Sequence, residues 1–129
     1  MRSVVICGSK KYREQIHQFA LELEELGVLV FEPNFKEPLP EYYKAETENI
    51  TNIIFKGLTL EHFDFVRKAD VCFVYNHENY TGTSVTMEMA YAHALSKPIF
   101  ALNSTTNEPC RDSLIDKVAK TPEELVKFL

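Results

Sequence analysis

The chain has 129 residues, of which 45% are hydrophobic and 12% aromatic; this fits one packed domain over residues 1–129 and excludes a globally disordered chain. Its 14 lysine and arginine residues are outnumbered by 19 aspartate and glutamate residues, which gives a formal net charge of −5. A domain that binds DNA or RNA through the phosphate backbone normally carries a basic surface, so we expect no polymeric nucleic acid as a partner.

The first third of the sequence predicts a β-α-β unit. Residues 4–7 form a short β-branched and apolar run, which is typical of a buried strand. Apolar side chains then recur at helical spacing over residues 12–26, and Gly27 is a typical helix stop. A second apolar run over residues 28–31 ends before Pro33. Strands joined by one helix pair in parallel, so we expect a parallel sheet.

The middle of the sequence has the least regular pattern. Residues 33–56 contain three prolines followed by a polar stretch, and we expect a loop with a helix of undetermined extent that ends at Gly57. A helical pattern over residues 58–68 and a strand pattern over residues 71–75 follow.

The last third continues the alternation of strands and helices. We expect a loop over residues 76–82, a helix over 84–96, a strand over 98–102 and a short fifth strand within 115–119. Thr121 then opens a final helix with a capping box. This order predicts an α/β fold, a doubly wound, Rossmann-like or flavodoxin-like three-layer sandwich with a mostly parallel sheet of four to five strands.

The sequence predicts neither a membrane protein nor a secreted one. No stretch approaches the ~18–20 consecutive apolar residues of a transmembrane helix, and the apolar run at the start is too short for a signal-peptide core. The three cysteines, Cys7, Cys72 and Cys110, form no CxxC pair, so we expect reduced thiols, two of them in the core. We therefore expect a cytoplasmic protein.

Candidate binding residues follow the strands, because ligands of doubly wound sheets bind at the carboxyl ends of the strands. Residues 8–13 join a glycine to a serine and basic side chains at a helix start, which suits a phosphate or a sugar hydroxyl. A plain glycine turn before a solvated helix start is the alternative. Residues 81–84 suit a helix cap and, in addition, sugar contacts. The substrate-binding candidates are Gly8, Ser9, Lys10, Tyr12, Asn76, Thr81, Gly82, Thr83, Tyr91 and Asn103.

Glu88 is the most informative residue of the sequence. It is the one fully charged side chain between residues 79 and 96, in a largely apolar helix that we expect to be buried on all sides. Burial of an unpaired carboxylate is costly, and Val85, three residues earlier, cannot complete a capping box with it. Glu88 is either a structural glutamate bonded to backbone or tyrosine, or a carboxylate presented to a pocket, as a nucleophile in sugar chemistry requires.

Three further side chains are candidates for the same site. Tyr91 follows Glu88 by about one helical turn, which places it to hold the carboxylate by a hydrogen bond. His62 and Asp64 precede the third strand and are candidate proton donors, although a lone histidine is more often structural. No His/Cys/Asp group has metal-ligand spacing, so we predict no metal and no cofactor.

Four segments resemble the nucleoside 2-deoxyribosyltransferase superfamily, including its 2'-deoxynucleoside 5'-phosphate N-hydrolase branch. They are residues 6–9, 25–30, 69–71 and, most specifically, 83–99, where the family carries its catalytic glutamate on a helix before a small-Lys-Pro-Ile strand entry. The order of elements is similar over most of the chain, with residues 33–56 left out.

The resemblance implies that Glu88 attacks the anomeric carbon of a (deoxy)ribosyl group, so that the base leaves and water or another base resolves a covalent glycosyl-enzyme. Gly8 and Ser9 match the region that holds the sugar or the 5'-phosphate in the family, and the basic residues after them favour nucleotides. The partner implied is therefore a small-molecule nucleoside or nucleotide. The resemblance also implies a homodimer or higher homo-oligomer, with the apolar helix from Ser84 as an interface.

The sequence departs from the family pattern at two places. Many members carry an aspartate just before the glutamate block, where residues 79–83 hold no acid, and another near the position of His62. Two alternatives therefore stay open. Residues 7–9 also resemble the start of the cytokinin-activating phosphoribohydrolases, although only residues 82–83 remain of their glycine-rich loop. The missing acid favours a non-catalytic nucleotide-sensing module.

Overall fold

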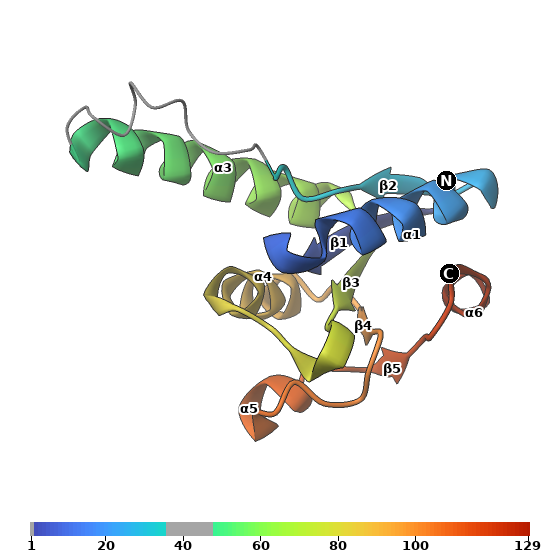
Figure 1. The fold of residues 1–129 in the computed structure, drawn as a ribbon. Helices are drawn as coiled ribbons and strands as arrows, with labels where there is room; N and C mark the ends of the chain where they lie inside the picture. The colour runs from blue at the N-terminus through green and yellow to red at the C-terminus, as the bar shows by residue number, and fades with distance from the viewer. Residues whose placement is uncertain (1, 36–47) are drawn as a thin grey trace.

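The protein is described by a computed structural model that covers residues 2–35 and 48–129. Five parallel strands form one sheet in the order β2-β1-β3-β4-β5 (Figure 1). This confirms the predicted doubly wound α/β fold, and the strand order reverses between β1 and β3, where such sheets form a ligand crevice. The strands are β1 (Ser3–Gly8), β2 (Leu29–Phe31), β3 (Val71–Tyr75), β4 (Ile99–Ala101) and β5 (Lys117–Val118).

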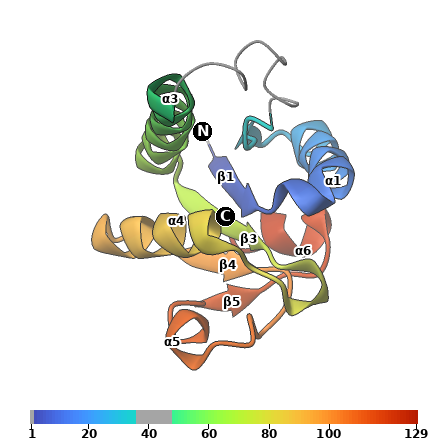
Figure 2. The ribbon, with the colours of Figure 1, turned by 60° about the vertical axis from the view of Figure 1, so that its left-hand side comes forward.

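Helices cover both faces of the sheet and make it the middle of three layers, as Figure 2 shows. α1 and α6 pack on one face, and α3 and α4 pack on the other. The bounds of these helices are α1 (Arg13–Glu25), α3 (Glu48–Lys68), α4 (Thr83–Ala94) and α6 (Pro122–Val126).

The strand side chains divide between two cores. Successive residues of a strand point to opposite faces of the sheet. On β1, Ile6 packs with the residues of α1, whereas Cys7 packs with those of α3 and α4. On β3, Phe73 stacks on Phe19 of α1 with their ring centroids 4.9 Å apart. Cys7 therefore faces the same side of the sheet as the helix that carries Glu88.

The predicted stop after α1 and the predicted Thr121 cap of α6 are confirmed, but the Glu124 carboxylate accepts from the Lys120 amide instead of completing the predicted capping box. Gly27 takes a left-handed φ of +82° directly after α1, and Thr121 Oγ1 accepts a hydrogen bond from the Glu124 amide at 3.2 Å at the start of α6. Ser96 ends α4 in the left-handed region, with a φ of +58°. Three single-turn helices were not predicted, because so few residues carry no periodic pattern. They are η1 (Lys10–Tyr12), η2 (His77–Asn79) and α5 (Pro109–Asp112).

The long helix α3 corrects the prediction for the middle of the chain. It begins at Glu48 and runs without a break through Gly57, where we expected a helix to end. This exposed glycine costs only about 1 kcal/mol in a helix interior. Burial of Val66 and Phe65 against the sheet outweighs that cost. Of the loop expected before this helix, residues 36–47 lie outside the described part of the chain.

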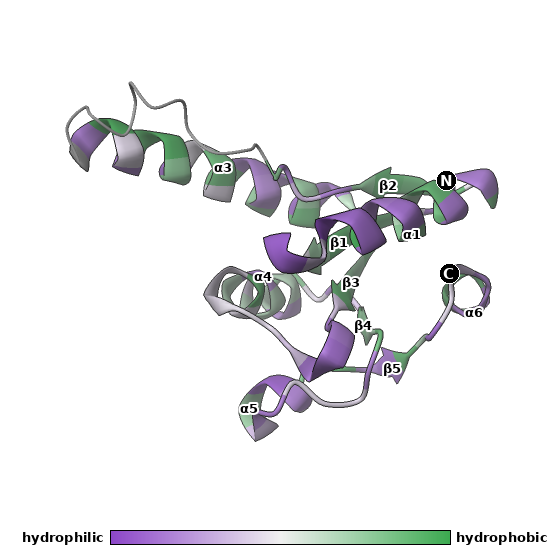
Figure 3. Ribbon diagram, viewed as in Figure 1, coloured by the Kyte–Doolittle hydropathy of each residue, from purple (hydrophilic) through white to green (hydrophobic). Residues whose placement is uncertain are grey.

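Apolar side chains are exposed on both helices of the α3–α4 face. The first part of α3 extends past the sheet (Figure 1) and alternates hydrophobic and hydrophilic turns (Figure 3). Ile53, Phe55 and Leu60 are each more than half exposed, and Met87 of α4 and Leu95, directly after this helix, are exposed as well. We expected α4 to be buried on all sides, and the structure shows that one side is exposed. Within the two described ranges, no helix is both long and apolar enough to cross a membrane.

Candidate active site

Glu88 lies in a cluster with His62 and Cys7, which come from three different elements. The Nε2 atom of His62 is 3.4 Å from Glu88 Oε2 and 3.4 Å from the Cys7 sulfur. The three ligand-type atoms all lie within 4.8 Å of one another. Cys7 is next to the last residue of β1, so the cluster lies under the carboxyl end of this strand. The structure thus brings the two predicted catalytic residues Glu88 and His62 together.

Burial shifts the pKa values of all three groups. The side chains of His62 and Glu88 are only 8% and 13% exposed. Burial raises the pKa of Glu88 to about 7, and a hydrogen bond from the Cys7 thiol opposes this change. Burial lowers the pKa of His62 to about 4. The pKa of Cys7 is well above its usual value because of its hydrogen bond to Cys72 and its burial. Near pH 7 the imidazole and the thiol are therefore neutral, and Glu88 is present in both its protonated and its ionised form.

Asp64 does not join this cluster. Its carboxylate binds Lys68 at 2.6 Å and Arg67 at 3.0 Å on the solvent side of α3. Those hydrogen bonds hold the pKa of Asp64 below its usual value. Its carboxylate is ion-paired at the surface and lies outside the cluster of Glu88, so the structure gives the predicted role of Asp64 as a proton donor no support.

Tyr91 also has a different partner from the one expected. Its hydroxyl accepts a hydrogen bond of 2.8 Å from the Arg67 guanidinium, and its ring lies 4.8 Å from that of Phe63. It therefore ties α4 to α3 instead of bonding to Glu88.

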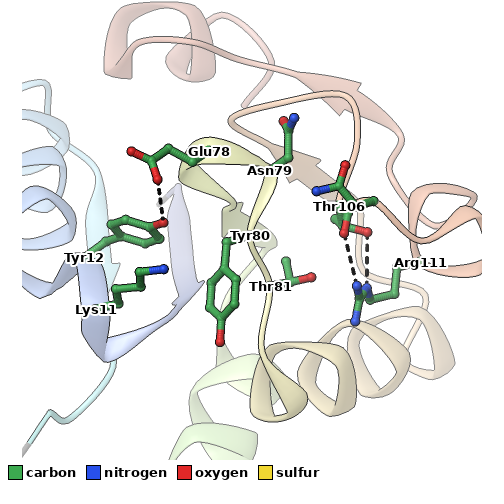
Figure 4. Close-up of a pocket in the computed structure, with 9 residues that line it drawn as sticks. Lys11, Tyr12, Glu78, Asn79, Tyr80, Thr81, Thr106 and Arg111 are labelled. Carbon is green, nitrogen blue, oxygen red and sulfur yellow. Dashed lines mark hydrogen bonds between the residues drawn. The ribbon is translucent and has the colours of Figure 1, made fainter.

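A pocket of about 350 Å³ opens at the carboxyl edge of the sheet (Figure 4). Two predicted substrate-binding residues, Tyr12 and Thr81, line it, but Glu88 does not. The lining comes from the segments that follow β1, β3 and β4, which is the edge where we expected the ligand. The full set of lining residues is Lys11, Tyr12, Glu78, Asn79, Tyr80, Thr81, Thr106, Asn107 and Arg111.

The pocket has cationic and aromatic walls. The Lys11 ammonium lies 4.6 Å from the centroid of the Tyr80 ring. Tyr12 donates a hydrogen bond to Glu78 at 3.4 Å on the same side (Figure 4). Across the pocket, the Arg111 guanidinium donates to the Thr106 carbonyl at 3.1 Å (Figure 4). Stacking surfaces and positive charges suit a planar base and an anionic group.

The segment between the pocket and α4 lacks the side-chain cap that we expected. Gly82 is the N-cap residue of α4, so no hydroxyl caps this helix. Thr83 is exposed in the first turn. Thr81 lines the pocket, and its hydroxyl oxygen is buried beneath the surface with no hydrogen-bond partner among the described residues. A buried hydroxyl normally finds a partner, so Thr81 stays a candidate for a substrate contact that would require a small local rearrangement.

Asn76 and Asn103 hold the ends of β3 and β4 together. The Asn76 side chain is fully buried; its amide donates to the carbonyls of Asn103 and Thr105 at 2.9 and 2.8 Å, and its oxygen accepts from the Asn103 amide at 2.9 Å. The Asn103 side chain donates to the Asn76 carbonyl and accepts from Lys120. Asn76 therefore has no exposed atom for a substrate, and its assignment as a binding residue is wrong.

The turn after β1 has structural roles that the sequence did not reveal. A Cβ atom on Gly8 would lie 2.6 Å from Ile16 Cδ1 and 3.2 Å from Tyr75 Cβ, so the glycine allows α1 to pack closely. The Ser9 hydroxyl accepts from the Lys11 amide at 3.2 Å and caps η1. Lys10 lines a separate hollow on the outside of η1 and α1. These three residues remain candidates for substrate contact, but none lines the pocket of Figure 4.

Sequence reasoning missed two parts of the site. Cys7 was read as a core thiol, and the contact with His62 joins residues 55 positions apart, which no local spacing reveals. Arg111 and Thr106 were also missed, although the carboxyl-end rule extends to the segment after β4. Lys11 could have been predicted as a pocket residue from the run of basic residues that follows Gly8.

No family model and no curated protein matches this sequence. Two of the solved structures that match do so over nearly the whole chain. A conserved protein from Enterococcus faecalis V583 is 12% identical with a TM-score of 0.65, over 98% of this chain and 96% of that one. A 2-deoxyribosyltransferase from Bacillus psychrosaccharolyticus is 16% identical with a TM-score of 0.62, over 95% and 89%. The chain thus has the fold of that transferase, as the family resemblance implied.

Proposed function

We propose that the protein cleaves the N-glycosidic bond of a nucleoside or nucleoside 5'-monophosphate, or exchanges its base, with Glu88 as the nucleophile. The observation that carries this proposal is the position of Glu88. It is a mostly buried carboxylate on α4 beside Cys7 of β1, in a fold shared with a 2-deoxyribosyltransferase. In doubly wound sheets this end of the first strand borders the ligand crevice.

The reaction consists of two displacements at one carbon. The Glu88 carboxylate attacks the anomeric carbon, the C–N bond breaks, and the base leaves with the bonding electrons and takes a proton from water. A covalent ester between Glu88 and the sugar results. Water or a second base then attacks the same carbon and releases Glu88. Two inversions give net retention, as in retaining glycosidases.

His62 is a positioning residue in this mechanism. Its Nε2 atom lies 3.4 Å from Glu88 Oε2. Because burial keeps the pKa of the ring at about 4, the imidazole is neutral near pH 7 and can orient the carboxylate without a charge. The same low pKa leaves the ring almost entirely unprotonated near pH 7, so His62 has no proton ready to donate to the leaving base.

The pocket supports a nucleotide as the proposed substrate class. Its volume of about 350 Å³ falls in the range of small-molecule sites. Tyr80 is 43% exposed and offers an aromatic face to a base, whereas Tyr12 is buried. Lys11 and Arg111 bring two positive charges to the pocket, and Glu78 brings one negative charge. These charges favour a nucleoside 5'-monophosphate over a nucleoside.

A non-catalytic nucleotide-sensing module is the second candidate. Glu88 does not line the pocket, and its pKa of about 7 leaves it protonated much of the time near neutral pH. Both observations fit a protein that binds a nucleotide without breaking it.

Base release separates the two candidates. Ribo- and deoxyribonucleosides and their 5'-monophosphates are incubated with the protein, with and without an added free base, and the products are separated by chromatography. Wild type should release base from at least one substrate, and Glu88→Gln should lose at least about a thousandfold in rate. Glu24→Gln, on the exposed side of α1, is the matched control and should keep the wild-type rate. Equal rates in Glu88→Gln and wild type would refute the nucleophile. Saturable binding without release would favour the sensor.

We also propose that two copies of the chain associate through the exposed apolar side chains of α3 and α4. Ile53, Phe55 and Leu60 on α3, with Met87 on α4, form the exposed apolar set, and such exposure commonly marks an interface. Light scattering should give a mass of at least twice the 14.9 kDa of one chain. A monomer mass at micromolar concentration would contradict the association.

A further inference from the structure

The cluster of Cys7, His62 and Glu88 has a second chemical capacity. Each residue offers one ligand atom, and sulfur, imidazole nitrogen and carboxylate oxygen are the three donors that Zn²⁺ takes from proteins. The sequence predicted no metal because the three residues lie far apart in the chain. We propose that they bind one Zn²⁺ ion, with the fourth position of the metal open.

The distances between the donors support a tetrahedral site. With bonds of about 2.3 Å to sulfur and about 2.0–2.2 Å to nitrogen and oxygen, ligand atoms at tetrahedral angles lie roughly 3.3–3.6 Å apart. The sulfur of Cys7 and Nε2 of His62 are 3.4 Å apart. That nitrogen and Oε2 of Glu88 are also 3.4 Å apart. Cys7 and Glu88 are close enough to share a hydrogen bond. Two of the three distances between the donors thus already match a tetrahedral site, and the third, between Cys7 and Glu88, is at most 4.8 Å.

Charge and ligand type favour zinc over the hard cations. A Cys7 thiolate and a Glu88 carboxylate balance the two positive charges of the ion, and His62 binds as a neutral ring. Binding displaces the thiol proton and any proton on Glu88, and both protons pass to the solvent. Magnesium and calcium prefer all-oxygen ligand sets. Cys72, 3.5 Å from Cys7, is placed to donate its S–H to the bound sulfur as an outer partner.

No other group of three such donors occurs in residues 2–35 and 48–129. His17 and Glu32 form a surface pair at 2.9 Å, and His77 and Glu78 form another at 3.7 Å. Both pairs are more exposed than the cluster. They therefore provide controls for weak surface binding.

The bound ion changes what Glu88 can do. Coordination to zinc occupies one oxygen of Glu88 and withdraws negative charge from the other, so the carboxylate becomes a much weaker nucleophile toward an anomeric carbon. Zinc therefore inhibits base release, a consequence that rests on the proposed function. The metal site itself does not depend on that function, because its ligands are defined by their positions alone.

Titration with Co²⁺, followed by competition with Zn²⁺, tests the site directly. Cobalt in a tetrahedral site with a thiolate ligand gives intense visible bands and a near-ultraviolet sulfur-to-metal band, and zinc then removes both. Wild type should bind one equivalent. Cys7→Ser, His62→Gln and Glu88→Gln should each lose more than about 100-fold in affinity, since loss of an outer partner alone costs about 10–100-fold. The matched control variants at exposed residues, Cys110→Ser, His17→Gln and Glu24→Gln, should bind cobalt as tightly as wild type does.

Several outcomes would overturn the metal site. They are the absence of cobalt bands in wild type, a sulfur band that persists in Cys7→Ser, and a band that is lost in Cys110→Ser. Circular dichroism checks that each variant is folded, and if Cys7→Ser is not, His62→Gln and Glu88→Gln decide. Cobalt bands on metal loading, together with no base release by the metal-free protein in the presence of a chelator, would refute the proposed function and leave the site standing. If protein that is shown to hold zinc releases base as fast as metal-free protein, the expected inhibition through Glu88 is refuted.

Discussion

Replacing Glu88 or His62 should change the pH dependence of stability in opposite directions. Burial raises the pKa of Glu88 from 4.5 to about 7 and lowers that of His62 from 6.5 to about 4. On folding at intermediate pH, Glu88 therefore takes up a proton and His62 releases one. Such proton exchange makes the free energy of unfolding depend on pH.

Each of these pKa changes corresponds to about 3 kcal/mol of unfolding free energy. The folded-state pKa of Glu88 lies above the unfolded value, so its contribution is fully favourable below about pH 4.5 and is lost as the pH rises through about 7. The folded-state pKa of His62 lies below the unfolded value, so its penalty is full below about pH 4 and disappears above about pH 6.5. In wild type the two contributions nearly cancel between these limits.

Urea unfolding monitored by circular dichroism measures the effect, with a chelator present to keep the protein free of metal. Between about pH 4 and about pH 7, Glu88→Gln should gain about 3 kcal/mol relative to wild type, because only the His62 contribution remains. His62→Gln should lose about 3 kcal/mol over the same range. Differences from wild type remove the contributions of all other groups, and Glu24→Gln should give a flat difference. Flat differences for both site variants would refute the burial of these groups.

Three further predictions concern the site and the fold. The kcat/KM for base release should rise with pH and level off above about pH 7, because Glu88 attacks as a carboxylate; a rate that falls over this range would exclude it as the nucleophile. Gly8→Ala should destabilise the protein by about 1–3 kcal/mol in urea unfolding. Adding Ile16→Val, which removes the clashing Cδ1 atom, should recover part of that loss, and strictly additive effects would contradict the packing. Ser96→Gly should raise the free energy of unfolding by up to about 1 kcal/mol because its φ is +58°, whereas Ser113→Gly, at a helical φ of −62°, should lower it.

Much of the fold could be predicted from local pattern. β3 is buried along its whole length. A continuous apolar run of five residues is typical of a strand that helices cover on both faces of a parallel sheet. Gly57 shows where local pattern fails. A glycine ends a helix when it takes the left-handed conformation, as Gly27 does, but at residue 57 the tertiary contacts of α3 continue the helix through it. The exposure of one side of α4 was not predicted, because an apolar helix sequence does not show whether other parts of the same chain pack against every side of the helix.

The candidate site could be predicted only in part. Glu88 was identified because a charge in an apolar helix needs a reason. Its contacts with His62 and Cys7 depend on how α3 and α4 pack on the sheet, which the spacing of residues does not encode. Asn76 was misassigned for a related reason. An asparagine at the end of a strand can bind a ligand or satisfy backbone groups, and only the fold shows that its amide is enclosed by the chain after β4.

The most direct measurement is mass spectrometry of protein quenched in acid during turnover of the best substrate of the panel. The two-displacement mechanism predicts a species heavier by one sugar residue, with the added mass on the peptide that contains Glu88 and absent from Glu88→Gln. Addition of a free base before quenching should discharge the adduct from a transferase. Base release with the adduct on another residue, or undiminished release by Glu88→Gln, would contradict the assignment of Glu88 as the nucleophile.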